Sequence, residues 1–119
     1  MEYKASARYQ KLAARKVRRV VDLVRGLPVD DALNTLRLSR RRAGATVSRL
    51  IRSALAAAAE RHDADAEALY VRRAWVDEGP MRYWRRPRAR GSWTRIRRRS
   101  SHIHVVLADR GDAEAPEEA

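Results

Sequence analysis

The largest cluster of functional side chains in the sequence is an arginine-rich segment, residues 82–99, in which nine of eighteen positions are arginine and none is acidic. A guanidinium is planar, stays charged at physiological pH and donates two parallel hydrogen bonds to a phosphate. Nothing within the segment neutralises these charges, so the pattern predicts binding to a phosphate-rich polyanion. The candidate binding residues are Arg82, Arg85, Arg86, Arg88, Arg90, Arg95, Arg97, Arg98 and Arg99.

Three aromatic residues, Tyr83, Trp84 and Trp93, are interleaved with these arginines. Unpaired RNA bases stack on aromatic rings and guanidinium planes, whereas a protein that reads a DNA groove more often presents a basic helix. The combination favours folded RNA over duplex DNA and adds the three rings to the candidate RNA-binding residues. The alternative is that the rings pack against neighbouring side chains of their own hairpin.

His102 and His104 share one face of a predicted strand, an arrangement that can hold a metal ion. The sequence has only three histidines and no cysteine, and no carboxylate lies near the pair in sequence to complete a coordination shell. We therefore expect no metal site. We interpret His102 as a phosphate or base contact at the root of the hairpin.

Asp77 and Glu78 are adjacent carboxylates that could suggest acid and base catalysis. Neighbours on a strand point to opposite faces, however, so these two groups would not converge on a substrate. We interpret them as neutralising Arg72 and Arg73 or as turning the chain before Gly79. We find no Ser, His and Asp arrangement, glycine-rich phosphate loop or zinc-protease motif in the sequence, and therefore expect neither an enzyme nor a cofactor.

The net charge of +12, from 27 lysines and arginines against 15 acids, also points to a polyanionic partner. Residues 109–119 hold five acids and one arginine, so residues 1–108 carry +16. A solvated basic surface, or attraction to anionic lipid, would also fit this charge, but the arginines do not follow an amphipathic lipid-binding helix. We expect residues 109–119 to be an acidic, disordered tail.

A chain of 119 residues without internal repeats predicts a single domain, over residues 1–108, rather than two. The sequence has neither an apolar run of membrane-spanning length nor a signal-peptide pattern, so we expect a cytoplasmic protein. The lack of cysteine excludes disulfides and thiolate metal sites.

The first nine residues alternate in polarity and predict a strand with Tyr3 and Tyr9 on the same side. The apolar residues that follow are spaced as on one face of a helix. We expect this first helix to stop at Gly26, because Pro28 comes soon after. A shorter second helix should open near Pro28. The apolar face of the first helix comprises Val17, Val20, Val21 and Val24.

A third helix is predicted to start from Ser39 as its N-cap and to run to about His62. Residues 40–42, all arginine, would then lie in its first turn, where the helix dipole disfavours cations unless a polyanion is near. Two strands follow, over residues 70–76 and 102–108. The apolar stripe of this helix comprises Val47, Leu50, Ile51, Ala54, Leu55 and Ala58.

Between these two strands, residues 78–101 have too few apolar side chains to bury two faces of a sheet. At roughly ten residues an arm and about 3.3 Å per residue, the segment would form a hairpin on the order of 30 Å long. Such a ribbon would extend well beyond the body, because a domain of this size has a radius of gyration of only about 13 Å. A two-stranded ribbon is also not stable by itself. We therefore expect an external scaffold to order it, with its tip between Pro87 and Gly91.

The hairpin resembles that of the bacterial large-subunit ribosomal protein twenty-two family in three motifs, which are VDEGP at residues 76–80, RPRARG at residues 86–91 and RIRRRSSHI at residues 95–103. The first strand and helix are similar to those of the same family at ARY in residues 7–9, RK in residues 15–16 and VVDLVRG in residues 20–26. The motifs occur in the expected order across residues 5–108.

The resemblance implies an α+β fold in which a three-stranded antiparallel sheet packs on about three helices and a long β-hairpin projects from it. It also implies a structural constituent of the large ribosomal subunit that binds 23S rRNA, supports assembly and lines the polypeptide exit tunnel with its hairpin. Implied partners are 23S rRNA, neighbouring large-subunit proteins including the protein four family, and the nascent peptide near the hairpin tip. We expect neither a membrane nor a second copy of the chain as a partner.

Candidate RNA-binding residues outside the hairpin are expected on the body. We interpret residues 40–42 and the arginines of the first helix as contacts to the same RNA. The candidate RNA-binding residues on the body are Arg8, Arg15, Lys16 and Arg18.

The sequence departs from the family pattern at four places. Ala13 and Ala14 stand where a Ser-Pro helix start is usual, which removes an N-cap worth about 1 kcal/mol. The other departures are Tyr83 and Trp84 in place of a pair with a basic residue, Ser92, Trp93 and Thr94 in place of Arg-Ala-Asp, and His104 in place of threonine.

Two other classes of function remain as alternatives. A free-standing nucleic-acid chaperone or nucleoid protein would share the charge but would bind loosely, and a nuclease would require catalytic groups. Resistance of binding to salt distinguishes the first from a ribosomal protein, because loose binding through many phosphates weakens steeply as salt rises.

Overall fold

The computed structural model describes residues 2–62 and 66–109. Within these residues the chain forms, in order, β1 (Glu2–Gln10), α1 (Ala14–Val24), α2 (Val29–Leu38), α3 (Ala43–His62), β2 (Leu69–Glu78), β3 (Arg82–Pro87), β4 (Trp93–Arg98) and β5 (Ser101–Asp109). Short 3-10 turns, η1 (Ala66–Ala68) and η2 (Ala89–Gly91), precede β2 and connect β3 to β4. Among the described residues, the helices are too short or too polar to cross a membrane.

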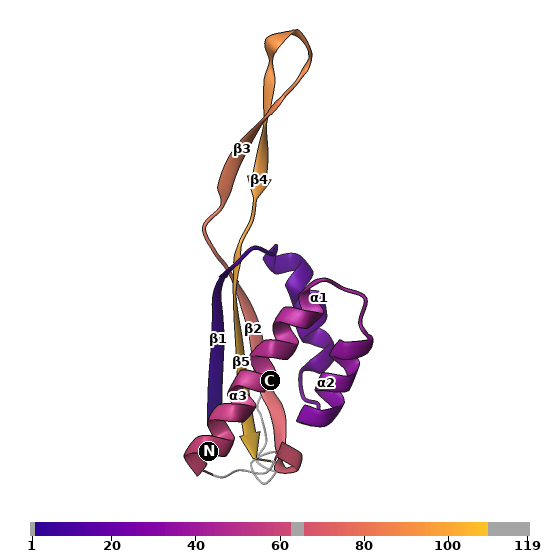
Figure 1. The fold of residues 1–119 in the computed structure, drawn as a ribbon, viewed down its shortest axis with the longest axis vertical. Helices are drawn as coiled ribbons and strands as arrows, with labels where there is room; N and C mark the ends of the chain where they lie inside the picture. Colours follow the sequence, from indigo (N-terminus) through magenta and orange to yellow (C-terminus); the bar gives the residue numbers. More distant parts are fainter. Residues whose placement is uncertain (1, 63–65, 110–119) are drawn as a thin grey trace.

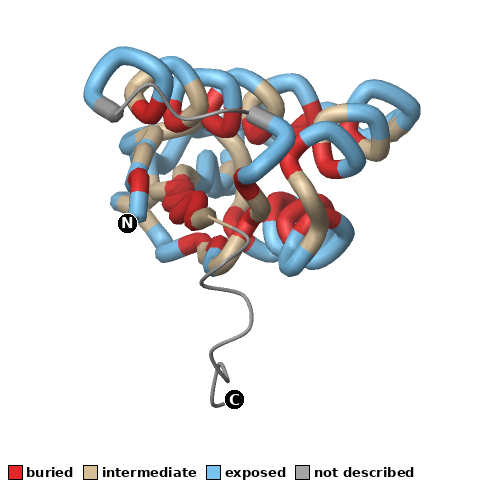
Figure 2. Tube along the Cα trace, turned by 90° about the horizontal axis from the view of Figure 1, so that it is seen from below, coloured by how far each residue is buried: buried red, intermediate tan, exposed pale blue. Residues whose placement is uncertain are grey.

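Three strands form the sheet of the body, in the order β1-β5-β2, with both pairings antiparallel. The three helices lie on one side of this sheet (Figure 1), and in the view along the long axis the helices and the sheet both contain buried positions, coloured red (Figure 2). Ile51 of α3, Leu69 of β2, and Ile103 and Leu107 of β5 are among the largest fully buried side chains. The α+β fold with a three-stranded sheet on three helices is therefore confirmed.

The first helix follows its valine spacing closely. All four valines of the predicted stripe are fully buried. The N-cap is Ala13, which makes no side-chain hydrogen bond, in agreement with the missing cap noted in the sequence. The helix ends at Val24, and Gly26 follows with a φ of +84°, a left-handed conformation that glycine adopts without steric strain.

The predicted start of the third helix is wrong. Ser39 is the C-cap residue of α2, and its Oγ accepts a hydrogen bond from the backbone N–H of Arg41 at 3.2 Å. Residues 40–42 form the connection between the helices, and α3 begins at Ala43. A serine hydroxyl can bond to nearby N–H groups in a turn as well as at a helix start, so sequence alone did not separate these two roles.

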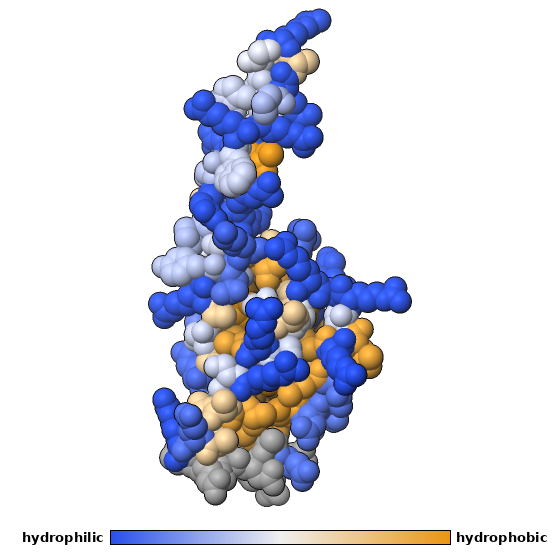
Figure 3. Space-filling model, in the orientation of Figure 1, coloured by the Kyte–Doolittle hydropathy of each residue, from blue (hydrophilic) through white to orange (hydrophobic). Residues whose placement is uncertain are grey.

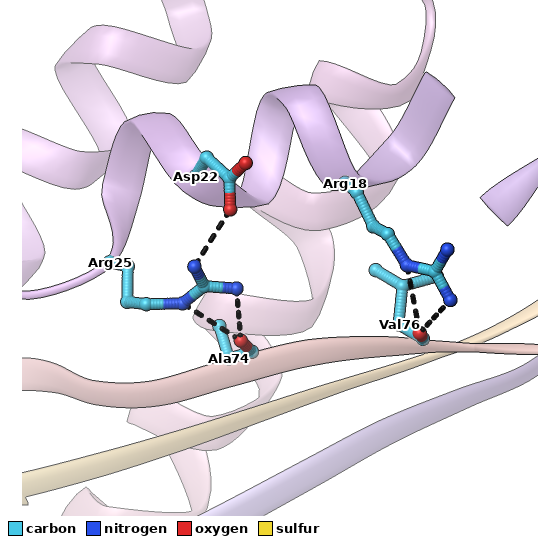
Figure 4. A network of polar contacts seen from close by, with 5 residues as sticks. All are labelled: Arg18, Asp22, Arg25, Ala74 and Val76. Carbon is cyan, nitrogen blue, oxygen red and sulfur yellow. Dashed lines mark hydrogen bonds and ion pairs between the residues drawn. The ribbon is translucent and has the colours of Figure 1, made fainter. Parts of the chain in front are cut away.

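Two arginines of α1 and its C-terminal end cover the outer edge of β2 (Figure 4). Arg18 donates from Nε and Nη2 to the carbonyl oxygen of Val76 at 3.3 and 2.9 Å. Arg25 donates from Nε and Nη2 to the carbonyl oxygen of Ala74 at 3.1 and 2.8 Å, and from Nη1 to Asp22 at 2.7 Å. An edge strand otherwise presents unpaired carbonyls to other chains, so these contacts close one edge of the sheet.

The remaining strands, β3 and β4, form a separate two-stranded sheet that projects from the body (Figure 1). The molecule measures 64 × 29 × 25 Å, and every residue of β3 is exposed. Arg90 at the tip has a φ of 62°. Atoms of hydrophilic residues dominate this projection in the space-filling view (Figure 3), so the hairpin has no apolar core of its own.

The last strand of the body sheet runs one residue further than the sequence predicted. The strand predicted to end at residue 108 continues to Asp109, which pairs with Leu69. The predicted acidic tail therefore starts inside β5, and residues 110–119 lie outside the described residues.

Candidate nucleic-acid interface

The pairing of β3 with β4 sorts the hairpin side chains onto two faces. Tyr83 pairs with Arg97 and Arg85 with Arg95, so these four share one face with Trp93. The opposite face carries Arg82 and Trp84, which pair with Arg98 and Ile96. Arginines and rings therefore alternate on both sides of the ribbon, rather than segregating into a basic side and an aromatic side.

Each of the three hairpin rings lies under a guanidinium group from the other strand. The guanidinium carbon of Arg85 is 4.5 Å from the ring centre of Trp93, and the corresponding distances are 4.9 Å for Arg95 with Tyr83 and 5.2 Å for Arg98 with Trp84. These distances are typical of cation–π contacts, each worth about 0.5–1 kcal/mol at exposed sites. The rings thus pack within the hairpin, the alternative raised from the sequence, yet about half of each remains exposed.

The hairpin arginines have no acidic partners among the described residues. The ion pairs there join Arg25 to Asp22, Arg72 and Arg73 to Glu2, and His104 to Asp77, all outside the hairpin. The three guanidinium groups that lie over rings also retain N–H donors, because a guanidinium carries five N–H groups and a ring contact uses only its face. The segment therefore presents nine uncompensated cations on a surface that stands away from the body.

A basic groove with a volume of about 1040 Å³ lies where the hairpin joins the body. We call it the junction groove. Its hairpin side carries Arg82, Trp84, Arg97, Arg98 and Arg99, with Pro80 and Ser100 at the hairpin base. Its body side carries Tyr9, Lys11, Leu12, Ala13, Lys16, Arg19, Arg41, Arg42 and Ala43. None of the described residues that line it is acidic, so nine cations face one hollow.

Sequence reasoning identified only part of this groove. Lys16 and the hairpin cations were in the predicted set, and Arg41, Arg42 and the first-helix residue Arg19 were interpreted as body contacts, but Lys11 was not singled out. The groove is assembled from four segments far apart in the chain, and no spacing within one segment indicates that they meet. A second hollow of about 480 Å³ shares Tyr9, Lys11, Leu12 and Arg42 and extends the groove toward Arg49.

Tyr9 does not lie on the buried side of β1 as the alternation predicted. The register of β1 with β5 shifts between Ala7 and Gln10, and Tyr9 has a φ of 58° and is 66% exposed. Its ring meets His102 edge-on at 4.8 Å, and its backbone N–H donates to His102 Nδ1 at 3.0 Å. A strand irregularity of this kind turns one side chain to the opposite face.

His104 joins the three strands of the body sheet on the face away from the core cluster. Its Nδ1 is 2.8 Å from Ser6 Oγ of β1, its Nε2 is 3.3 Å from Asp77 Oδ2 of β2, and its ring stacks on Trp75 at 5.0 Å. The structure thus brings together a Ser, a His and an Asp, whose spacing in the sequence gave no indication that they meet. His104 is only 7% exposed, whereas the side chain of Asp77 is 59% exposed, so a buried imidazole bridges the strands and its carboxylate partner faces solvent.

The structure corrects two interpretations made from the sequence, one on the partner of Asp77 and one on the carboxylates near the histidine pair. Asp77 contacts His104, and the carboxylate that pairs with Arg72 and Arg73 is Glu2. A carboxylate therefore does lie beside His104 in space, although none lies near it in sequence. No cluster of three or more metal-ligating side chains occurs among the described residues.

The pKa of His104 is lowered from its ordinary value of 6.5, first because burial disfavours the charged imidazolium. The carboxylate of Asp77 opposes this shift and raises the pKa, whereas the charges of Lys4, Arg8 and His102 lower it further. The neutral imidazole is therefore the form that fits the sheet.

The four body residues of the predicted RNA-binding set do not converge on one place. Only Lys16 lines the junction groove. Arg8 and Arg15 are exposed, on β1 and α1. Arg18 directs two of its nitrogens to Val76, so part of its guanidinium serves the fold.

Comparisons with known proteins match nearly the whole chain. The family model described as ribosomal protein L22p/L17e matches residues 5–108. The large ribosomal subunit protein uL22 of Chloroflexus aggregans is 45% identical over 112 residues, covering 94% of this chain and 99% of the relative. The proteins of that name from Thermus thermophilus and Bdellovibrio bacteriovorus are 46% and 43% identical over 110 residues, covering 92% of this chain and 97% and 100% of the relatives.

Proposed function

Because the chain belongs to the ribosomal protein L22p/L17e family, we propose that it binds 23S rRNA, supports assembly of the large subunit and lines the polypeptide exit tunnel with its hairpin. It is a structural constituent of the large ribosomal subunit, located in the ribosome in the cytoplasm, and it is not an enzyme. The proposed rRNA contacts are argued from the hairpin and from the surface of the body.

The observation that carries the proposal is the set of nine hairpin arginines with no ion pair among the described residues. Nine cations on a narrow ribbon repel one another unless a polyanion surrounds them. Phosphates of folded RNA supply that charge, and release of their counterions favours binding in proportion to the number of phosphates neutralised. The ribbon carries the cations near its tip away from the body, which suits insertion between RNA segments.

We assign the contacts as follows. The hairpin binds through the nine arginines of residues 82–99, the three rings and His102, and residues 88–90 at the tip approach the tunnel wall, the nascent peptide and the protein four family. Residues 1–108 form a single rRNA-binding domain, which includes the hairpin at about residues 78–101. The rest of this domain contacts rRNA through Arg8, Arg15, Lys16 and the outer nitrogens of Arg18.

Cosedimentation with the large subunit at about 0.5 M salt tests this function. The full chain should remain with the particle, because many contacts in a folded RNA site act together. A loosely bound nucleic-acid chaperone would be stripped at this salt. Loss of the chain from otherwise intact particles would overturn the proposal.

A further inference from the structure

We propose that the junction groove holds a short, unpaired RNA segment, with one of its bases stacked on Trp84. This inference deepens the proposed rRNA binding and rests on it. It concerns a site at the hairpin base, separate from the arginines of the tip.

The first support is the convergence of charge on the groove. Lys11 and Arg19 approach from the N-terminal part of the body, Arg42 from the connection between α2 and α3, and Arg82 and Arg97 from the hairpin. Cations from separate elements along one hollow are the arrangement with which proteins follow the backbone of a single strand. A free anion such as phosphate would be bound by two or three of these groups, and the remainder would stay uncompensated.

The second support is the size of the groove. Its volume of about 1040 Å³ is slightly above the roughly 300–1,000 Å³ that hold a drug-sized ligand. That space accepts a few nucleotides of a single strand. An RNA duplex would rest on the rim, because its phosphates and shallow minor groove are read from outside by broader surfaces.

The third support is aromatic surface at the groove. Trp84 is 56% exposed, and Arg98 lies at 5.2 Å on one side of its ring, so the ring can stack with a base while the cation fixes its orientation. Tyr9 is 66% exposed at the opposite wall. Stacking on such rings tolerates any base, whereas a duplex keeps its bases out of reach.

The probe is a fluorescently labelled uridine hexanucleotide, whose binding to the full chain is measured by anisotropy at about 0.1 M salt. Trp84→Leu should lower its affinity about tenfold, the loss typical of one stacked base, whereas Trp84→Phe should retain most of the affinity. Trp75→Leu is the matched control, because Trp75 also lies under a cation, Lys4, at 5.5 Å, has no assigned RNA contact and does not line the groove. Circular dichroism confirms that each variant is folded.

A longer blunt RNA duplex and an acidic hexapeptide identify the ligand class. Duplex affinity should change less than twofold in Trp84→Leu, and the peptide should bind more weakly than the hexanucleotide. Equal losses in Trp84→Leu and Trp75→Leu, an equal loss for the duplex, or preference for the peptide would each overturn the inference.

A phosphate-directed pair of variants separates this inference from the proposed function. Lys11→Ala with Arg42→Ala should flatten the salt dependence of hexanucleotide binding by up to about two phosphate contacts, relative to Arg37→Ala with Arg52→Ala outside the groove. If the groove pair has no effect while loss of the tip arginines still weakens 23S rRNA binding, the groove inference fails alone. If the full chain fails to bind 23S rRNA at all, the proposed function fails.

Discussion

The backbone N–H of Gly79 donates to the carbonyl oxygen of Ser100 at 3.0 Å, and this bond holds the hairpin where it leaves the body. Ser100 Oγ donates in turn to the carbonyl oxygen of Pro80 at 2.6 Å. A Cβ atom on Gly79 would lie 2.5 Å from Ser100 Oγ and 3.3 Å from the backbone carbon of Ser100. Any other residue at position 79 would have to displace the Ser100 hydroxyl from its bond to Pro80 or move the two strands apart at the neck.

Substitution Gly79→Ala should therefore destabilise the protein by about 1–3 kcal/mol, the range for forcing extra atoms into a packed site. The free energy of unfolding is measured by urea denaturation. The double variant Gly79→Ala with Ser100→Ala should recover part of the loss, since the nearest clashing atom is gone. An alanine variant as stable as the wild type would show that the neck opens without cost.

Loss of the guanidinium groups of Arg18 and Arg25 should destabilise the fold, because the carbonyls of Val76 and Ala74 lose their charged donors. Methionine at either position retains much of the aliphatic stem, so urea denaturation isolates the polar contribution, which we expect to be about 1–2 kcal/mol for each. Arg15→Met, on the same helix and exposed, is the control and should change stability by less than about 0.5 kcal/mol. Equal effects at all three positions would argue against edge closure.

Acid should weaken the fold through His104. A histidine whose pKa is lower in the folded than in the unfolded chain binds fewer protons when folded, so stability contributed by its neutral form falls as pH drops below about 6.5. His104→Gln should flatten this decline in unfolding free energy between about pH 7 and 5. Asp77→Asn should steepen it, because the carboxylate raises the histidine pKa. A decline unchanged in both variants would exclude His104 as its source.

Removal of the tip charges should flatten the salt dependence of RNA binding. The triple variant Arg86→Ala, Arg88→Ala and Arg90→Ala should bind 23S rRNA more weakly, and its slope of log affinity against log salt should fall by up to about three contacts. A charge-matched variant, Arg37→Ala, Arg52→Ala and Arg61→Ala, removes exposed arginines of α2 and α3 and should leave the slope nearly unchanged. A slope identical to that of the wild type would remove the tip from the RNA interface.

The elements that periodicity predicted well are those in which one face is buried. The valine spacing of α1 and the apolar stripe of α3 both reach the core. The hairpin was predictable for the opposite reason, since residues 82–99 offered nothing to bury. Patterns of this kind depend on neighbours three, four or two positions away, which the sequence displays directly.

Contacts between segments that are far apart in the chain could not be predicted from the sequence. Ser6, Asp77 and His104 meet only because β5 pairs with both β1 and β2. Tyr9 turned outward because of a register shift in β1, and the sequence carries no mark of it. The junction groove likewise depends on how the hairpin base rests against the body, which periodicity does not report.

The 64 Å length of the molecule has an electrostatic consequence. The Debye length at 0.1 M salt is about 10 Å, so charges at the hairpin tip and at the far end of the body do not sense one another. In the proposed complex the protein is thus a bivalent ligand, whose two ends contribute additively. Once the body is anchored, the tip searches for its RNA segment at a high effective concentration, and late-forming parts of a large RNA can be gathered around a ribbon already in place.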